Sequence, residues 1–278
     1  MLEIGKRQVL SVVKKVDFGV YLAEGDKAEE KVLLPKKEVP EGTELHDQMD
    51  VFLYKDSSDR LIATREEPKL HLGELAVLKV VDTGKIGAFL DWGLPKDLML
   101  PFREQTAKVQ PGDECLVALY LDKSQRLCAT MKVYHYLRTD SPYEKGNTVE
   151  GRIYEISDNF GTFVAVDDCY SGLIPRRESR EPLAVGQVLK LRVSGVKEDG
   201  KLDLSTRERI PVQMEKDAAF LLSMMEQRGG ELPFTDKAEA ELIVRECGLS
   251  KNAFKRAVGR LLKQGKIQIE ENKIVKKN

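Results

Sequence analysis

The chain has 278 residues, a formal net charge of −1, 41% hydrophobic residues and 33% charged residues, a balance that excludes a wholly disordered protein. No stretch approaches the roughly 18 consecutive apolar residues of a membrane-spanning helix, and the N-terminal residues lack an apolar signal core. The four cysteines and three histidines form no CxxC motif or Cys/His cluster. We therefore expect no metal, no cofactor and a cytoplasmic protein without disulfides.

The small net charge hides an uneven distribution. Residues 1–70 hold 12 Lys/Arg against 15 Asp/Glu, whereas residues 213–278 hold 13 against 10. Within the last segment, residues 249–277 carry nine basic residues against only Glu270 and Glu271. Only the C-terminal part is visibly basic, which favours an acidic partner there.

One pattern occurs three times before residue 206. It consists of a glycine flanked by aromatic or aliphatic residues, an apolar stretch that ends in proline, and a stretch that runs from a basic residue to Thr or Ser. Its copies are residues 17–22, 32–35 and 60–64; residues 85–90, 98–101 and 126–130; and residues 159–164, 172–175 and 201–205. The glycine-to-proline separation is 16, 14 and 14 residues, and the proline-to-Thr/Ser separation is 29, 29 and 30. This spacing predicts three repeats, because one large all-β domain would not explain it.

Each repeat has the pattern of short strands separated by turns. In repeat three, residues 149–156 and 188–193 alternate between apolar and polar, and residues 160–166 are largely apolar and β-branched. Asp158-Asn159 and residues 198–200 supply turns between these strands. About five strands in roughly 65 residues favour a small OB-type barrel over a sandwich.

The residues after about 210 have helical spacing instead. The pattern predicts helices over residues 212–228 and 235–246, and a third helix that Ser250 caps and Gly265 ends. A hairpin over residues 267–275, turning at Glu271-Asn272, would follow. Three helices and a hairpin are typical of a winged-helix domain.

The expected fold class is mainly β with a C-terminal α+β part, formed by three tandem OB-fold barrels and a winged-helix domain. The expected domains are residues 1–67, 68–140, 141–210 and 211–278.

The motifs Phe-Gly-Thr-Phe-Val, Gly-Leu-Ile-Pro and Gly-Lys-Leu-Asp-Leu-Ser within residues 160–205 resemble the RNA-binding OB repeat named after the S-one ribosomal protein. Repeats two and three resemble it clearly, and repeat one resembles a divergent form with a longer second loop. Together with the C-terminal residues 247–261, the chain resembles the conserved virulence factor B (CvfB) family, whose members are bacterial regulators thought to act through RNA. The resemblance covers nearly the whole chain.

The resemblance implies that two aromatic residues of the first motif face solvent and stack bases, at about 1–3 kcal/mol per base. The residues at these positions are Phe18 and Tyr21, Phe89 alone, and Phe160 and Phe163. Because residues three apart on a regular strand point to opposite faces, Gly19 or Gly161 must bend the chain for both rings to reach one surface. The alternative is that one ring of each pair belongs to the core. Ile86 replaces an aromatic residue in repeat two.

The resemblance also implies basic residues that contact phosphates. The basic position of the third motif is occupied by Arg60, Arg126 and Lys201, and the position four residues earlier by Asp56, Asp122 and Lys197. Proline stands where the family commonly has a histidine, at Pro35, Pro101 and Pro175. Repeat three is the preferred RNA site because it also contains Arg176, Arg177 and Arg180. The alternative is that these residues are ordinary solvated surface.

The predicted third helix offers a second basic surface. Its Lys and Arg residues recur at three- and four-residue spacing opposite the apolar stripe, as in a recognition helix that contacts phosphates. The candidate contacts are Lys251, Lys255, Arg256, Arg260, Lys263 and, on the wing, Lys273. RNA, DNA and a protein partner are the alternatives for this surface, because many winged helices dock proteins.

An enzyme is the rival interpretation, and the sequence disfavours it. No Walker-type phosphate loop, nucleophile elbow or HExxH motif occurs, and the adjacent carboxylates Asp167-Asp168 lie in an expected loop. We predict a non-enzymatic regulator without a membrane partner that grips single-stranded RNA and influences virulence-factor expression post-transcriptionally. The alternative is a protein-docking adaptor of the translation or RNA-decay machinery, which the net acidic charge of residues 1–70 favours.

Overall fold

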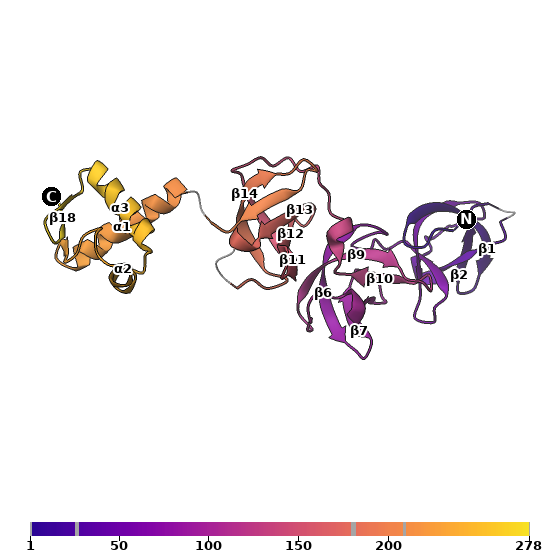
Figure 1. Ribbon diagram of the computed structural model, residues 1–278. Helices are drawn as coiled ribbons and strands as arrows, with labels where there is room; N and C mark the ends of the chain where they lie inside the picture. The colour runs from indigo at the N-terminus through magenta and orange to yellow at the C-terminus, as the bar shows by residue number, and fades with distance from the viewer. Residues whose placement is uncertain (1, 26–27, 179–181, 208–209, 278) are drawn as a thin grey trace. The chain divides into compact units, whose positions relative to one another are not determined.

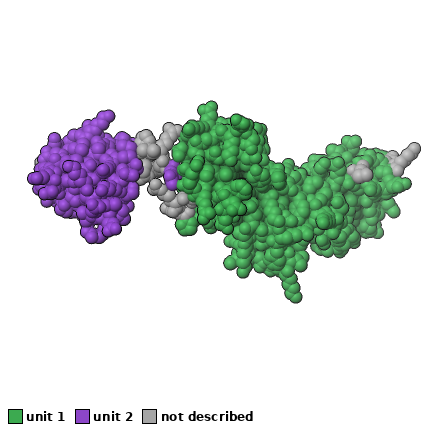
Figure 2. Space-filling view, in the orientation of Figure 1, with its two compact units in different colours: residues 1–206 green, residues 207–278 purple. Residues whose placement is uncertain are grey.

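Short strands make up the chain as far as Ser205, and helices dominate after it (Figure 1). The computed structural model describes residues 2–25, 28–178, 182–207 and 210–277, with side chains for all of these except residues 210–213. Arg180, which we expected in the RNA site, lies outside the described residues. The chain divides into two units, residues 1–206 and residues 207–278 (Figure 2).

Repeat one is a closed barrel with ring order β1-β2-β3-β5-β4. Its strands are β1 (Arg7–Val16), β2 (Gly19–Ala23), β3 (Val32–Pro35), β4 (Gln48–Lys55) and β5 (Leu61–Thr64). Alternation along each strand directs one set of apolar residues inward, as on β4, where Met49, Val51 and Leu53 are buried in the barrel core.

Repeat three is a closed barrel of the same order, and repeat two is the same ring opened at one place. The strands of repeat three are β11 (Thr148–Ser157), β12 (Gly161–Val166), β13 (Tyr170–Pro175), β14 (Val188–Val196) and β15 (Leu202–Ser205). Those of repeat two are β6 (Leu75–Thr83), β7 (Gly87–Asp91), β8 (Leu98–Pro101), β9 (Glu114–Leu121) and β10 (Leu127–Thr130).

The sheet of repeat two has the order β10-β9-β6-β7-β8, so its ring is open between β8 and β10. The predicted mainly β fold with tandem barrels is confirmed. One strand differs slightly from the expectation, because β12 begins at Gly161 and leaves Phe160 in the preceding turn.

Two local features recur in every repeat besides the motifs. The first strand contains a bulge, between Val12 and Lys14, between Val80 and Asp82, and between Ile153 and Glu155. A bulge bends and twists its strand, which helps short strands to close into a ring. A 3₁₀ turn also follows the proline of the second motif, as η1 (Lys36–Glu38), η2 (Phe102–Glu104) and η4 (Arg176–Glu178).

Buried contacts join the repeats to one another. Phe52 and Tyr54 of repeat one pack against Trp92 of repeat two, with ring centroids 5.9 and 6.2 Å apart. Tyr154 of repeat three lies in a second buried cluster with Leu116 of repeat two. Because apolar surface is removed from water at both junctions, the three repeats form one unit rather than beads on a flexible chain.

The C-terminal unit has the predicted winged-helix pattern of helices and strands. Its elements are α1 (Ile210–Gln227), β16 (Glu231–Leu232), α2 (Ala240–Cys247), α3 (Lys251–Lys263), β17 (Ile267–Ile269) and β18 (Ile274–Lys276), with sheet order β16-β18-β17. Leu221, Ile243, Phe254 and Leu261 are buried together in its core. No described helix is long and apolar enough to cross a membrane.

Helix boundaries in this unit follow local hydrogen bonds. Ser250 caps α3 as predicted, because its hydroxyl oxygen accepts a hydrogen bond from the Ala253 backbone N–H at 3.3 Å. The second helix was predicted from Thr235, and this start is wrong. The Thr235 carbonyl accepts the Ala238 backbone N–H in a tight turn, and Glu239 is extended, so the helix begins only at Ala240.

Candidate nucleic-acid interface

The two aromatic residues of repeat three lie side by side although β12 begins between them. The Phe160 and Phe163 ring centroids are 6.4 Å apart, and 66% of Phe160 is exposed, whereas Phe163 is half-buried. Gly161 makes this possible, because its φ of +118° bends the chain. A Cβ at Gly161 would also lie 2.3 Å from the Ile174 carbonyl oxygen. The bend at Gly161 that brings both rings to one surface is therefore present. Phe163 is partly exposed, so it is not simply a core residue.

Repeat one has the same arrangement. Phe18 is 58% exposed, Tyr21 is half-buried, and their ring centroids lie 6.5 Å apart in a T-shaped contact. Gly19, between them, has a φ of +153°. Two exposed lysines lie near this pair along the backbone, since Lys14 is the cross-strand partner of Tyr21 and Lys36 donates its backbone N–H to the Phe18 carbonyl at 2.9 Å. One exposed carboxylate, that of Asp17, directly precedes Phe18, so the residues near the rings carry more positive than negative charge although residues 1–70 are acidic overall.

Repeat two lacks the exposed aromatic residue of the first motif, as the sequence indicated, but it contains another exposed aromatic residue, Phe102. Phe89 is half-buried, and Ile86 takes the exposed position with 61% of its surface in contact with solvent. Phe102, 55% exposed, donates its backbone N–H to the Ile86 carbonyl at 3.3 Å. Sequence analysis missed Phe102, although it directly follows Pro101, where the other repeats have Lys36 and Arg176.

The basic residues of the third motif in repeats one and two are held by carboxylates. Arg60 pairs with Asp56 at 2.7 Å and Arg126 pairs with Asp122 at 3.0 Å. Burial acts to raise the pKa of each aspartate, but hydrogen bonds from the arginine and from a backbone N–H lower the pKa below its ordinary value. These arginines stabilise turns, so their guanidinium groups are only partly available to phosphates.

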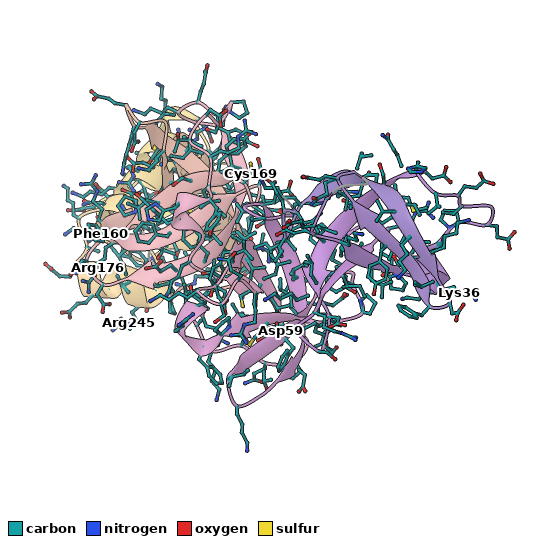
Figure 3. The ribbon with its side chains drawn as sticks, turned by 90° about the vertical axis from the view of Figure 1, so that its right-hand side faces the viewer. Lys36, Asp59, Phe160, Cys169, Arg176 and Arg245 are labelled. Atoms are coloured by element: carbon teal, nitrogen blue, oxygen red, sulfur yellow. The ribbon has the colours of Figure 1, made fainter. Side chains whose placement is uncertain are left out.

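Repeat three brings its basic residues close to the aromatic pair. Arg176 donates a hydrogen bond to the Asp158 carbonyl, with 3.0 Å between donor and acceptor. Asp158 lies two residues before Phe160, and the side chains of Arg176 and Phe160 lie at the same edge of the barrel (Figure 3). Arg177 is exposed beside Arg176. Because this charge is beside an exposed ring, the edge can offer both a stacking surface and a cation.

The two lysines of repeat three occupy the turn at which the other repeats have an Asp–Arg pair. Lys197 lies 3.4 Å from Asp203, and Lys201 lies 2.6 Å from Asp199. Lys201 also lies over the ring of Tyr134, 5.5 Å from its centroid. Sequence analysis missed Tyr134, because it belongs to the segment between two repeats.

The candidate residues of the winged helix fall into two groups. Lys255, Arg256 and Lys263 are exposed, and Lys251 is half-buried. Arg260 pairs with Glu215, and Lys273 pairs with Glu231 at 2.8 Å. The second group is therefore engaged in ion pairs within the domain, and the exposed residues of α3 are the stronger candidates for contact with a partner.

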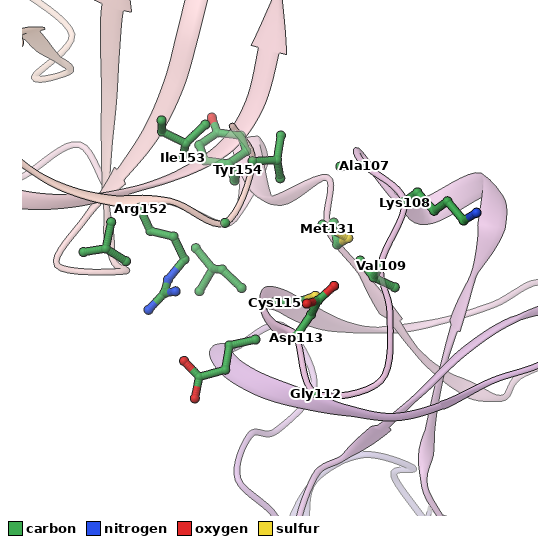
Figure 4. A pocket seen from close by; sticks show the side chains of 15 residues that line it. Ala107, Lys108, Val109, Gly112, Asp113, Cys115, Met131, Arg152, Ile153 and Tyr154 are labelled. Atoms are coloured by element: carbon green, nitrogen blue, oxygen red, sulfur yellow. The ribbon is translucent and has the colours of Figure 1, made fainter. Parts of the chain in front are cut away.

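An open cavity of about 580 Å³ lies between repeats two and three (Figure 4). Arg152 lines it but is held by Asp168 through two hydrogen bonds of 2.8 and 3.2 Å. Burial raises the pKa of the Cys115 thiol to about 11, so this thiol stays protonated at neutral pH. Among the described residues, no group of three or more His, Cys, Asp or Glu side chains could hold a metal ion.

Sequence profiles of three families match the chain. The profile described as "S1 domain" matches residues 4–66 and 72–132, "Virulence regulatory factor CvfB, second domain" matches residues 135–208, and "CvfB-like winged helix domain" matches residues 219–275. The third repeat is thus matched by a profile specific to one family rather than by the general S1 profile.

Similar proteins extend over the full length of the chain. The protein described as "Uncharacterized protein YitL" of Bacillus subtilis is 33% identical over 275 residues, which cover 96% of this chain and 91% of the relative. "Conserved virulence factor B" of Staphylococcus aureus strain N315 is 29% identical over 98% of this chain and 93% of its own. A crystal structure from Streptococcus pneumoniae, described as a multidomain protein with nucleic acid binding domains, is similar over 99% of this chain and 98% of its own, with 25% identity and a TM-score of 0.52.

Proposed function

The chain belongs to the conserved virulence factor B family, and we propose that it is a non-enzymatic cytoplasmic regulator that binds single-stranded RNA through its barrels. In this proposal it influences virulence-factor expression post-transcriptionally, and its four domains are residues 1–67, 68–140, 141–210 and 211–278. The winged helix is an auxiliary site for RNA, DNA or a protein partner.

The observation that carries the proposal is the exposure of Phe160 beside Arg176. A single exposed apolar residue is common on a protein surface, but Phe160 is 66% exposed, contacts a second ring in Phe163 and lies beside a guanidinium group. Any of the four RNA bases can stack on such a ring, so the contact does not depend on the RNA sequence, and the adjacent guanidinium can contact a phosphate. Phe18 with Lys36 repeats the combination in repeat one.

The charges around Phe18 favour RNA over the alternative of a protein-docking adaptor. The acidic balance of residues 1–70 argued for an adaptor, because negative charge repels RNA. Lys14 and Lys36, however, lie beside Phe18 and Tyr21. Because Coulomb interactions at a surface are screened beyond roughly 10 Å, these two lysines outnumber the one adjacent carboxylate, Asp17, and matter more than the distant carboxylates. The description of the Streptococcus pneumoniae protein as containing nucleic acid binding domains gives further support.

The test is fluorescence-anisotropy titration of an unstructured RNA with the full chain over a salt series. We expect Phe160→Ala to weaken binding about tenfold, which corresponds to about 1.4 kcal/mol and lies within the 1–3 kcal/mol that one stacked base contributes. Phe220→Ala, which removes another half-exposed phenylalanine from the C-terminal unit, is the matched control and should bind as the wild type does. Absence of binding by the wild type at low salt would overturn the proposal and favour the adaptor.

A further inference from the structure

The segment between repeats two and three is bound firmly to repeat three. Val133 and Leu137 are buried in the cluster that also contains Tyr154. Arg138 then adds to the sheet, because its backbone N–H donates to the Cys169 carbonyl at 2.9 Å and its carbonyl accepts the Ser171 N–H at 2.8 Å. These contacts fix the backbone of residues 133–138 against the barrel.

Burial of Val133 and Leu137 leaves the residues between them facing the surface. Tyr134, the second residue of η3 (Val133–His135), is 38% exposed, and its ring lies 5.8 Å from that of Phe163 in a T-shaped contact. Phe163 itself is half-buried and also contacts Tyr154, at 6.0 Å. Phe163 thus contacts two more exposed rings, those of Phe160 and Tyr134.

Lys201 completes the surface on the Tyr134 side. Its Nζ lies 5.5 Å from the Tyr134 ring centroid, a distance at which a cation is attracted to an aromatic face. The Asp199 carboxylate accepts a hydrogen bond from the same Nζ at 2.6 Å. Hydrogen bonds to Asp199 and then to Tyr134 raise the pKa of Lys201, so the ammonium group is charged beside the ring at any physiological pH.

We propose that Phe160 and Tyr134 are the two base-stacking residues of repeat three, with Phe163 as the support between them and Lys201, which Asp199 holds in place, as a cation beside Tyr134. The inference rests on the proposed function and names the residues that carry it. The centroid distances of 6.4 Å from Phe160 to Phe163 and 5.8 Å from Phe163 to Tyr134 link the three rings through direct contacts. Since Tyr134 precedes repeat three in the chain, the RNA site of this repeat is incomplete without the preceding segment.

The arrangement also indicates the route of the RNA. A strand that stacks on Phe160 and then on Tyr134 runs from the turn before β12 towards the end of repeat two. His135 extends the same surface, because its ring lies 5.2 Å from that of Tyr134 and is exposed. A single RNA would therefore pass from one repeat to the next over this segment.

The first test compares Tyr134→Ala, Tyr134→Phe and Phe160→Ala in the full chain, by anisotropy with the same unstructured RNA. We expect about tenfold weaker binding for each alanine variant, as for loss of one stacked base, and wild-type affinity for Tyr134→Phe, which keeps the ring. Thermal unfolding of each variant shows whether the alanine changes affect the fold. If Tyr134→Ala binds within twofold of the wild type while Phe160→Ala is weakened, the inference is wrong and the proposed function stands.

A second measurement reports contact directly. In the Tyr134→Trp variant, RNA should quench the fluorescence of the new tryptophan, because a stacked base covers the indole. The natural Trp92 is only 2% exposed and changes little, so the wild type is the matched background. Unchanged fluorescence in a variant that still binds RNA would place the RNA elsewhere and overturn the inference. No RNA binding by the wild type would overturn both this inference and the proposed function.

Discussion

Ser205 donates a hydrogen bond from its buried hydroxyl to the Glu178 carboxylate, with 2.7 Å between Oγ and Oε2. The same contact joins Thr130 to Glu104 at 2.9 Å and Thr64 to Glu38 at 2.6 Å. In each repeat it links the end of the last strand to the 3₁₀ turn after the third strand. In repeat two this side-chain hydrogen bond joins the β8 side of the ring to β10, two strands that are not paired through their backbones.

This contact predicts that Thr130→Val destabilises repeat two. Valine has the shape of threonine but cannot donate, so Glu104 would lose a hydrogen bond in a site that water reaches poorly. We expect a loss of about 1–3 kcal/mol in the free energy of unfolding, measured by chemical denaturation. Thr83→Val, at an exposed position at the end of β6, is the control. Equal losses in the two variants would contradict the proposed role of the hydrogen bond.

Gly161→Ala should destabilise repeat three and displace Phe160. The variant would place a Cβ 2.3 Å from a backbone oxygen at a φ of +118°, so we expect a cost of at least about 1–3 kcal/mol by calorimetry. In contrast, Gly259→Ala lies within α3 with no atom inside 4 Å of the added Cβ. It should stabilise the winged helix by roughly 0.5–1 kcal/mol. A neutral Gly161→Ala would show that the bend does not depend on glycine.

Asp122 should make stability depend on acid pH. Burial acts to raise its pKa, but hydrogen bonds from Arg126 and Ser124 outweigh burial and lower the pKa. A carboxyl whose pKa is lower in the folded state adds stability above its ordinary pKa of about 3.9, and the contribution is lost as the pH falls below that value. The free energy of unfolding of Asp122→Asn, measured by chemical denaturation, should thus be about 1–2 kcal/mol lower than that of the wild type at pH 7. This difference in the free energy of unfolding should become smaller at pH 3. A gap that is independent of pH would indicate a steric cause.

The four thiols should differ in reactivity. Burial raises the pKa of Cys115, Cys128 and Cys247 to about 11 each, whereas Cys169 is half-buried. At pH 8, a disulfide reagent such as DTNB should therefore modify one thiol rapidly and the others only after unfolding, and Cys169→Ser should remove the rapid phase. The contribution of these three thiols to the free energy of unfolding is fully present below the ordinary thiol pKa of about 8.5. It is lost as the pH rises from there through about 11, the pKa in the folded state.

The exposed residues of α3 decide whether the winged helix adds to RNA binding. Changing Lys255 and Arg256 together to alanine removes two cations without breaking a described ion pair. If both contact phosphates, the salt slope of RNA binding should fall in magnitude by about 1.4, at roughly 0.7 per contact. The same change should leave the slope unaltered if this surface docks a protein, and the anisotropy titration distinguishes the two results.

The local part of the fold was predictable from the sequence. Turn residues and alternating strands recur at constant spacing, and Ser250 precedes an apolar stripe, so the barrels and the helix α3 could be predicted in chain order. These patterns are short-range, because a turn or a cap depends on residues within a few positions. The start of α2 could not be predicted in the same way, since the turn at Thr235 replaces its first residues through local hydrogen bonds.

Motif spacing and periodicity were enough to predict the three repeats, the winged helix and the aromatic positions Phe18 and Phe160. The residues that complete those positions became apparent only in the folded chain. Tyr134 lies 29 residues before Phe163 yet contacts its ring, and Lys14 lies beside Tyr21 through strand pairing. Exposure, ring contacts and local charge depend on which distant segments the barrel brings together. Because motif spacing reflects only the order of residues along the chain, it does not predict those contacts.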